Sequence, residues 1–521
     1  MQDTTLYLII LVAYLAGMVG IGFFFYAKNT NIADYVLGSR GLGPIASAMS
    51  AQASDMSGWL LMGVPGLAYA LWEGTAEAVW VVLGLWIGTY LNWLLVARRL
   101  RLFTGGLDVI TLPDYFAKRF QDKSGVLRVV SAVFILIFFL VYTASMFSAG
   151  GKLFHTVFGI DYRIALIGGG AIIVSYTFLG GFLAVCWTDV IQGILMFFAL
   201  VITPIGAFIY LARNGGVQAA IDHAANGNEF SLFNVGNHGC LAIFILSNVC
   251  WGLGYFGQPH ILPRFMGIKS PGEIKIARRI AMAWVTITLG TAVLCGVAGA
   301  GIFPNLEDPE TVFMHTTRQL FPPFIAGILV TAILSAIMST ADSQLLVTSS
   351  AAASDLFHRT FYPNASEKST LWVSRATVIT VSILALALVY IENPDPNTIL
   401  GKLNASIFKL VAFAWAGFGA AFGPLILCSL FWRRTTLIAA IAGILSGGTT
   451  TFFWRFLSGG PFGIFDLYEV VPGLVVSLVV IIAATFLQSP NTKLMELFDR
   501  LKNGDGTPIG AIGNDGEAGV N

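Results

Sequence analysis

The stretch SAMSAQASDMSGWLLMGVPG, residues 47–66, lies within an apolar segment and yet carries a carboxylate among hydroxyl and amide groups. An ionisable residue such as Asp55 is costly at the centre of a bilayer unless it faces a cavity or finds polar partners. Its polar neighbours in the sequence are Ser50, Gln52, Ser54 and Ser57. A lipid-facing helix does not explain this composition, so we predict that the segment lines a functional site inside a membrane-spanning fold.

The rest of the chain has the composition of a membrane protein. Of its 521 residues, 56% are hydrophobic and 11% are charged, whereas soluble chains have about 25% charged residues. Apolar runs of about 20 residues recur, each long enough to cross a bilayer as a helix. We therefore expect an all-α integral membrane protein and exclude a water-soluble enzyme. The net charge of +1 argues against nucleic-acid binding, and no GxxxxGK[ST] motif supports ATP-driven transport.

These apolar runs predict thirteen transmembrane helices. They lie near residues 6–26, 45–71, 76–96, 126–152, 163–180, 188–212, 238–257, 276–301, 318–353, 371–391, 403–430, 434–457 and 470–487. With the N-terminus outside, all but seven of the 29 Lys and Arg residues fall on inner loops or in the tail, Arg264 among them. The exceptions are Lys152, Arg163, Arg213, Arg318, Lys402, Lys409 and Arg455. This asymmetry favours an N-out, C-in topology.

The seventh predicted helix is interrupted as well. Its sequence CWGLGYFGQPH, residues 250–260, contains glycines and a proline, which weaken and then break a helix. The second and seventh helices are five apart, so each opens a block of five helices, and an odd-numbered block inverts its topology when repeated. Paired interruptions of this kind indicate the binding site of a secondary transporter. The alternative is that the small residues only allow close helix packing.

The domain organisation follows from this repeat. We expect an additional N-terminal helix with an inner loop, two inverted repeats (helices 2–6 and 7–11), two C-terminal helices and a cytoplasmic tail. Their ranges are 1–44, 45–212, 213–430, 431–487 and 488–521. Because the end of the tail is glycine-rich and polar, we expect the tail to be disordered.

The ninth predicted helix carries a polar stripe. In FIAGILVTAILSAIMSTADSQLL, residues 324–346, Ser335, Ser339 and Ser343 recur every four residues and therefore share one helix face. A single hydroxyl in a membrane helix can simply bond to its own backbone. A cluster of hydroxyls deep in a long span instead indicates a binding site.

The same stripe suits a sodium ion. The Ala336 carbonyl lies one turn before the Ser339 and Thr340 hydroxyls, so three oxygens can converge. Hard cations prefer such oxygen ligands. We expect the unwound backbone near Ala53 and Met56 in the second helix to supply two more.

Five segments resemble signatures of the sodium:solute symporter family. They are ASDMSGWLLMG (53–63), TLPDYF (111–116), GGFLAVCWTD (180–189), WGLGYFGQPHILPRFM (251–266) and AIMSTADSQLL (336–346). The similarity runs colinearly from about residue 6 to residue 487. It implies a leucine-transporter-like fold with a five-plus-five inverted-repeat core, located in the bacterial cytoplasmic membrane, and sodium-coupled symport of L-proline.

The resemblance also implies site residues. The sodium ligands would be the carbonyls of Ala53, Met56 and Ala336 and the hydroxyls of Ser339 and Thr340. Asp55 would support this site electrostatically. The proline pocket would draw on Ser57, Gly58, Trp59, Tyr142, Trp251, Tyr255, Phe256, Gln258 and Pro259. Trp251 and Tyr255, four residues apart, would share a helix face and offer aromatic rings to the ammonium group of proline.

A second sodium site is a further possibility that the resemblance raises. Some relatives use a serine at the position of Asp342, together with Ser343 and an aspartate matching Asp189. Asp342 could instead form a structural hydrogen bond or pair with a basic neighbour, and we prefer these alternatives. Asp189 could equally cap the N-terminus of the sixth helix.

The expected partners are L-proline, the sodium ion as coupling ion, and membrane lipid, with no organic cofactor and no nucleic acid. The runner-up function is symport of another small solute, such as pantothenate or another amino acid. A function of a different class is that of an uncoupled sensor or channel with the same fold, against which the Ser339–Thr340 pair argues. The sequence leaves the oligomeric state open and is compatible with a monomer.

Overall fold

The computed structural model describes residues 2–26, 36–70, 72–177, 181–225, 232–233, 240–391, 398 and 406–509. Within these ranges nine helices are long and apolar enough to cross a membrane, and four shorter apolar helices accompany them. Each of the thirteen predicted spans overlaps one of these segments, and the all-α prediction is confirmed. The number of crossings and the N-out orientation stay predictions.

The helices follow one another without an intervening sheet in the described part of the chain. Their bounds are α1 (Gln2–Tyr26), α3 (Pro44–Asp55), α4 (Val64–Tyr69), α5 (Trp72–Leu91), α6 (Ala97–Gly106), α7 (Leu112–Arg119), α8 (Val126–Phe158), α9 (Tyr162–Thr177), α10 (Phe182–Arg213), α11 (Val217–Ala225), α12 (Leu241–Val249), α13 (Leu262–Met266), α14 (Ile274–Ile302), α15 (Val312–Leu320), α16 (Pro323–Ser350), α17 (Glu367–Val389), α19 (Ile407–Phe431), α20 (Leu437–Trp454), α21 (Val470–Phe486) and α22 (Thr492–Asn503). Short 3₁₀ or π segments are η1 (Gly38–Arg40), η2 (Trp59–Gly63), η3 (Asn92–Val96), η4 (Cys250–Gly257), η5 (Pro271–Glu273), η6 (Pro309–Thr311), η7 (Ala351–Phe361) and η8 (Pro461–Asp466).

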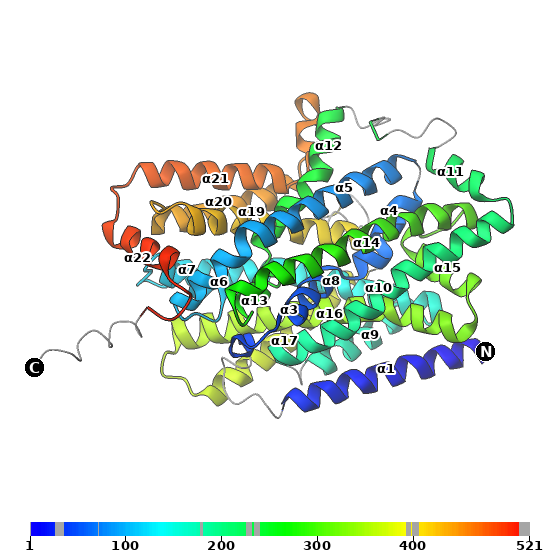
Figure 1. Ribbon diagram of the computed structural model, residues 1–521, viewed down its shortest axis with the longest axis horizontal. Helices are drawn as coiled ribbons and strands as arrows, with labels where there is room; N and C mark the ends of the chain where they lie inside the picture. Colours follow the sequence, from blue (N-terminus) through cyan, green and yellow to red (C-terminus); the bar gives the residue numbers. More distant parts are fainter. Residues whose placement is uncertain are drawn as a thin grey trace, which may run out of the picture.

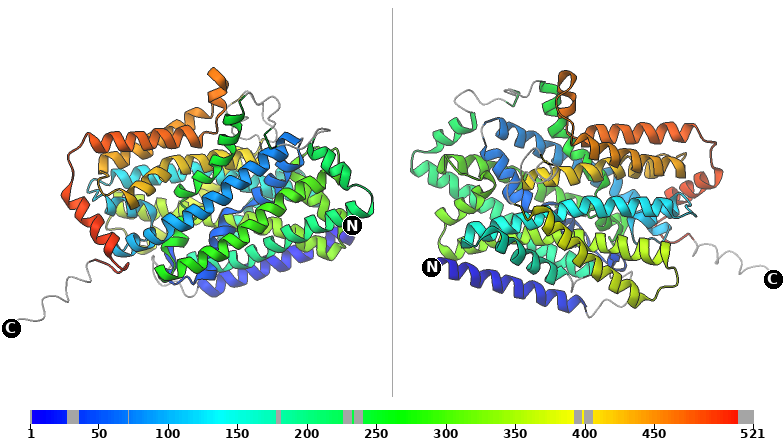
Figure 2. Two further views of the ribbon diagram at one scale, coloured as in Figure 1. Left: turned by 45° about the horizontal axis from the view of Figure 1, so that its top comes forward. Right: turned by 180° about the vertical axis from the view of Figure 1, so that it is seen from behind.

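Two helices form the centre of the bundle. In the most apolar stretch of α19, 94% of the residues are buried, and in that of α16 with η7 the share is 83%. The corresponding share for α1 is 22%. Figures 1 and 2 accordingly show α1 along one edge of the molecule and α21 along the opposite edge. The polar stripe of α16 therefore lies inside protein and not against lipid.

Both predicted interruptions are present. The helix α3 ends at Asp55, because Met56 leaves the helical region with φ −81° and ψ 77°, and the chain resumes in η2 and α4. The second break follows η4, where Gln258 is extended before α13 begins at Leu262. Irregular backbone at membrane depth is tolerated only where it is buried in protein or lines a cavity. The two breaks are thus the natural place for a binding site.

Two predictions are wrong, one about the start of a helix and one about the tail. The helix α10 begins at Phe182, before the predicted start at 188, so Asp189 lies within the helix and does not cap it. The tail is helical in α22, where Asn491 caps the first turn and a side formed by Leu494, Phe498 and Leu501 is buried. The apolar spacing of these three residues stabilises the docked helix. Residues 510–521 lie outside the described residues.

Glycines set the distance between α5 and η4. A Cβ atom added to Gly88 would lie 2.1 Å from the Gly252 carbonyl oxygen, whereas one added to Gly290 on α14 would meet no atom within 4 Å. Overpacking a tight contact costs about 1–3 kcal/mol or more. We therefore expect Gly88→Ala to lower the melting temperature of the detergent-solubilised protein by several degrees, with Gly290→Ala as the neutral control. Equal melting temperatures for the two variants would contradict this packing argument.

Candidate functional site

Oxygens from α3 and α16 converge at the first break. The Ser339 hydroxyl donates to the Ala53 carbonyl at 2.7 Å, and its oxygen also lies 3.1 Å from the Ala336 carbonyl oxygen. The Thr340 hydroxyl lies 3.5 Å from the same Ala53 oxygen. All four residues are buried. The structure thus brings together four of the five predicted sodium ligands, and the fifth residue, Met56, lies at the break itself.

This donor set fits a sodium ion. It consists of carbonyl and hydroxyl oxygens, which a hard cation prefers, and contains no sulfur or nitrogen. The hydroxyl hydrogens now point at carbonyl oxygens. Each hydroxyl oxygen also carries lone pairs, which can face an ion once the O–H bond rotates.

Asp55 links the two interrupted helices. One of its carboxylate oxygens, Oδ2, accepts a hydrogen bond of 2.5 Å from the Tyr255 hydroxyl on η4. Its backbone carbonyl accepts from the Trp59 indole nitrogen at 2.9 Å. The other carboxylate oxygen, Oδ1, is buried and has no hydrogen-bond partner among the described residues. An unpartnered buried carboxylate oxygen is costly, so it is available to a cationic group.

Gln258 presents a second unpartnered acceptor at the other break. Its side-chain nitrogen donates to the carbonyls of Gly254 at 3.0 Å and Trp415 at 3.1 Å, which fixes the orientation of the amide. Its Oε1 atom is buried and has no hydrogen-bond partner within the described ranges. The predicted pocket residues therefore include an oriented acceptor of the kind that a secondary ammonium requires.

The other predicted pocket residues are buried, and all but Tyr142 of α8 lie close to one of the two breaks in sequence. Trp59, Phe256 and Pro259 adjoin the breaks, and Tyr142 packs edge-on against His260 with ring centroids 5.8 Å apart. Ser57, whose hydroxyl accepts from the Trp59 amide at 3.3 Å, and Gly58 lie between α3 and η2. A Cβ on Gly58 would lie 3.1 Å from the Ala149 Cβ, so this position favours glycine.

The expectation that Trp251 and Tyr255 share a helix face is wrong. Both lie in η4, a 3₁₀ helix, in which three residues complete a turn, so side chains four apart diverge. Trp251 stacks between Phe408 and Tyr468, with centroid distances of 4.8 and 5.1 Å. Tyr255 turns toward Asp55 instead. Trp251 and Tyr255 therefore contact different parts of the bundle.

The sequence analysis missed Trp415 of α19. Its indole nitrogen donates to the Trp251 carbonyl at 2.8 Å, and its ring meets Tyr255 edge-on at 4.8 Å. A Cβ on Gly254 would lie 2.0 Å from that indole nitrogen. No signal in the apolar sequence around Trp415 distinguishes it from a packing residue.

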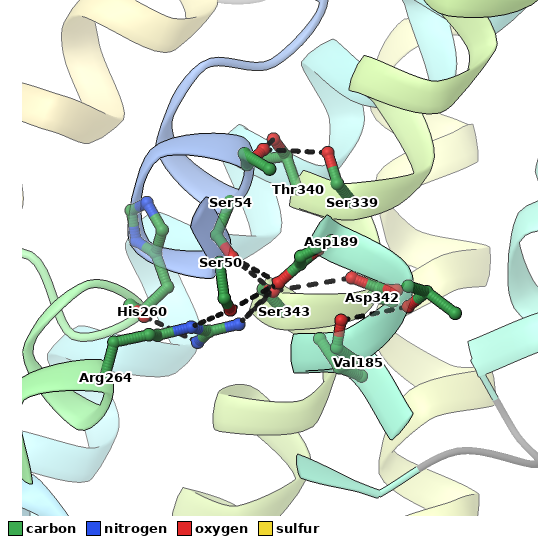
Figure 3. Close-up of polar contacts among 12 residues, drawn as sticks. Ser50, Ser54, Val185, Asp189, His260, Arg264, Ser339, Thr340, Asp342 and Ser343 are labelled. Carbon is green, nitrogen blue, oxygen red and sulfur yellow. Dashed lines mark hydrogen bonds and ion pairs between the residues drawn. The ribbon is translucent and has the colours of Figure 1, made fainter. Parts of the chain in front are cut away.

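Arg264, which the sequence analysis counts among the inner-loop residues, lies in the short helix α13, and its side chain is fully buried. Figure 3 shows it extended from α13 toward the residues proposed for a second ion. Its Nη2 atom lies 2.6 Å from the Ser343 hydroxyl and 3.3 Å from Asp189 Oδ2. Ser343 also donates to Asp342 Oδ1 at 3.4 Å. The three residues named for a second site are thus together, with a guanidinium among them.

A small cavity adjoins the second break. Pro259 and Pro263 line one part of it and Thr111, Ser350 and Asp355 another. The loop with Thr111 is a predicted inner loop, so this space extends from the candidate pocket toward the predicted cytoplasmic side.

Known proteins resemble this chain over most of its length. The model of the sodium:solute symporter family matches residues 35–447. A sodium/proline symporter of Salmonella typhimurium and one of Escherichia coli are each 43% identical to this chain. Each alignment covers 96% of this chain and 96% of the relative. A high-affinity proline transporter of Bacillus subtilis is also 43% identical, over 92% of this chain and 98% of its own.

Solved structures show the same fold at low sequence identity. A sodium-coupled sialic acid symporter in an outward-open state has a TM-score of 0.72 at 19% identity, covering 93% of this chain and 98% of its own. A transporter of the nucleobase-cation-symport-1 family has a TM-score of 0.56 at 15% identity, covering 91% of this chain and 99% of its own. The broken-helix bundle is therefore the fold of cation-coupled symporters, as the sequence predicts.

Proposed function

This chain belongs to the sodium:solute symporter family, and we propose that it is a secondary transporter that carries L-proline into the cell together with sodium by alternating access. The observation that carries the proposal is the convergence of the Ala53 and Ala336 carbonyls with the Ser339 and Thr340 hydroxyls between a broken helix and the core helix α16. The near full-length relatives named for proline support the choice of substrate.

In this mechanism sodium binds first, from outside. It joins α3 to α16 through the four oxygens and the Met56 carbonyl, and Asp55 contributes negative charge beside them. The membrane potential assists the inward step by about 2.3 kcal/mol per charge per 100 mV.

Proline then binds between the two breaks. Its secondary ammonium is a donor, and the oriented Gln258 Oε1 is an acceptor that has no partner among the residues that the structure describes. The Tyr255–Asp55 hydrogen bond connects the helix that holds proline to the helix that holds sodium. Closing of the outer side and opening toward the space beside Pro259 release both solutes inside.

The test of this function is uptake of labelled proline by proteoliposomes. We expect an inward sodium gradient to drive accumulation above the external concentration, and an equal potassium gradient to drive none. If proline neither binds nor enters while the protein is folded, symport of another small solute, such as pantothenate, becomes the better hypothesis. Equilibration of proline without sodium would favour an uncoupled channel or sensor.

Gln258→Met is expected to weaken proline binding selectively. The substitution removes the acceptor with little change in volume, and loss of a hydrogen bond to a charged group costs about 1.5–3 kcal/mol, or roughly 10- to 100-fold in affinity. Proline KM should rise by that factor, while the affinity for sodium measured without proline stays unchanged. An unchanged proline KM in this variant would show that Gln258 does not contact proline.

A further inference from the structure

His260 follows Pro259 in the second break, and its imidazole is buried without a polar contact to the described residues. The residue is 0% exposed, and neither Nδ1 nor Nε2 has a hydrogen-bond partner within the described ranges. The Arg264 guanidinium donates to the His260 carbonyl at 2.6 Å, and Figure 3 shows the imidazole pointing away from that contact. In either protonation state an imidazole carries at least one N–H donor, and a buried donor without an acceptor is costly.

The imidazole packs against the face of α8 that also carries a predicted pocket residue. The rings of His260 and Tyr142 are perpendicular, with centroids 5.8 Å apart, and Phe139 meets the same imidazole at 5.7 Å. Phe139 and Tyr142 are three residues apart and therefore lie on one side of α8. The Tyr142 hydroxyl is buried and, like the imidazole, has no hydrogen-bond partner in the described part of the chain. Two donors without acceptors are thus neighbours beside the candidate pocket.

These donors complement the two acceptors already described. Asp55 Oδ1 and Gln258 Oε1 are buried acceptors without a partner among the described residues. L-Proline carries one group of each kind, because its secondary ammonium donates hydrogen bonds and its carboxylate accepts them. Buried polar groups in proteins are generally hydrogen-bonded. Two unpartnered acceptors and two unpartnered donors around the breaks therefore match a zwitterion better than either charge alone.

We propose that His260 is a specificity-determining residue of the proposed proline site, where its ring N–H donates a hydrogen bond to the substrate carboxylate. This inference rests on the proposed proline symport and adds the group that recognises the acidic end of the substrate. The site then takes small amino acids with a free carboxylate and discriminates against an amide that has the same ring.

The competing explanation is that His260 only packs against α8. An N–H group can point at an aromatic face in a weak interaction that needs no ligand. The two roles differ in their effect on a ligand without a carboxylate. Loss of packing weakens every ligand of the pocket alike, whereas loss of a carboxylate donor weakens only the ligands that carry a carboxylate.

The experiment compares L-proline with L-prolinamide, in which a neutral amide replaces the carboxylate. Displacement of labelled proline from the purified full chain in sodium buffer gives both affinities. We expect the wild type to bind L-proline at least about 10-fold more tightly than L-prolinamide, because a hydrogen bond to a charged group is lost. His260→Phe keeps a planar ring and removes both nitrogens, so the ratio of the two affinities should fall by about 10-fold.

Phe139→Leu is the matched control. It alters the packing of the same imidazole and removes no polar atom, so the ratio should stay at the wild-type value. If His260→Phe does not fold, His260→Met carries the same expectation, because the flexible methionine side chain adapts to irregular space.

A wild type that binds the two ligands equally overturns the proposal without any variant. An unchanged ratio in a folded His260 variant, or an equal fall in Phe139→Leu, overturns it as well. These outcomes differ from failure of the proposed function, in which the wild type binds neither ligand or its proline uptake ignores sodium.

Discussion

Asp55→Asn is expected to abolish sodium-driven proline uptake at millimolar sodium. Asparagine keeps the shape of the side chain and an acceptor for Tyr255 but removes the negative charge beside the proposed ion site. At an effective dielectric constant of about 20, a charge about 5 Å away contributes roughly 3 kcal/mol, which corresponds to about 100-fold in sodium affinity. The measurement is ²²Na⁺ binding to the purified variant, together with proline uptake over a range of sodium concentrations.

Tyr255→Phe is the matched control for Asp55→Asn. It removes the hydroxyl that donates to Asp55 at 2.5 Å and leaves the carboxylate charged. We expect this variant to weaken the effect of sodium on proline binding more than it weakens sodium binding itself. If both variants lowered sodium affinity equally, the hydrogen bond between the two broken helices, and not the charge, would be the important feature.

Ser339→Ala and Thr340→Ala are each expected to raise the sodium concentration for half-maximal uptake by about 10- to 100-fold. Each removes one neutral oxygen from the ion, and a bond between a neutral and a charged group contributes about 1.5–3 kcal/mol. Proline affinity at saturating sodium should change much less, because neither hydroxyl belongs to the proposed pocket. Sodium titration of uptake in proteoliposomes measures both quantities.

Ser349→Ala and Thr348→Ala provide controls of the same chemistry on the same helix. Their hydroxyls are buried and donate to the carbonyls of Leu346 at 3.0 Å and Gln344 at 2.6 Å. Both contacts lie within α16, so sodium activation should be unchanged. Unaltered activation in the Ser339 and Thr340 variants would exclude the proposed ion site.

Much of the candidate sodium site was predictable from the sequence because its signals are local. A carboxylate among hydroxyls in an apolar run, as around Asp55, is too costly in lipid to occur without a polar environment. A hydroxyl every fourth residue, as at Ser339 and Ser343, defines one face of a helix whatever the helix packs against. Pro259 removes a backbone donor wherever it occurs. Membrane class, interrupted helices and the α16 stripe follow from such rules.

Contacts between distant segments depended on the tertiary structure. The sequence does not reveal that the indole of Trp415 would meet Tyr255 and Gly254, because an apolar run with one tryptophan fits any packed helix. Nor does it reveal that η4 would be a 3₁₀ helix, which turns Trp251 away from Tyr255.

Arg264 shows the difference most clearly. By sequence it is one more basic residue near a membrane boundary, where the positive-inside tendency assigns it to a loop. The break before α13 turns its guanidinium back into the bundle, where it meets Asp189, 75 positions earlier in the chain. The sequence by itself determined the membrane fold, the two breaks and the residue types at the ion site, because local polarity and helix periodicity encode them. The partner of each buried charge was decided only by tertiary packing, because Coulomb interactions depend on distance in space and not on separation along the chain.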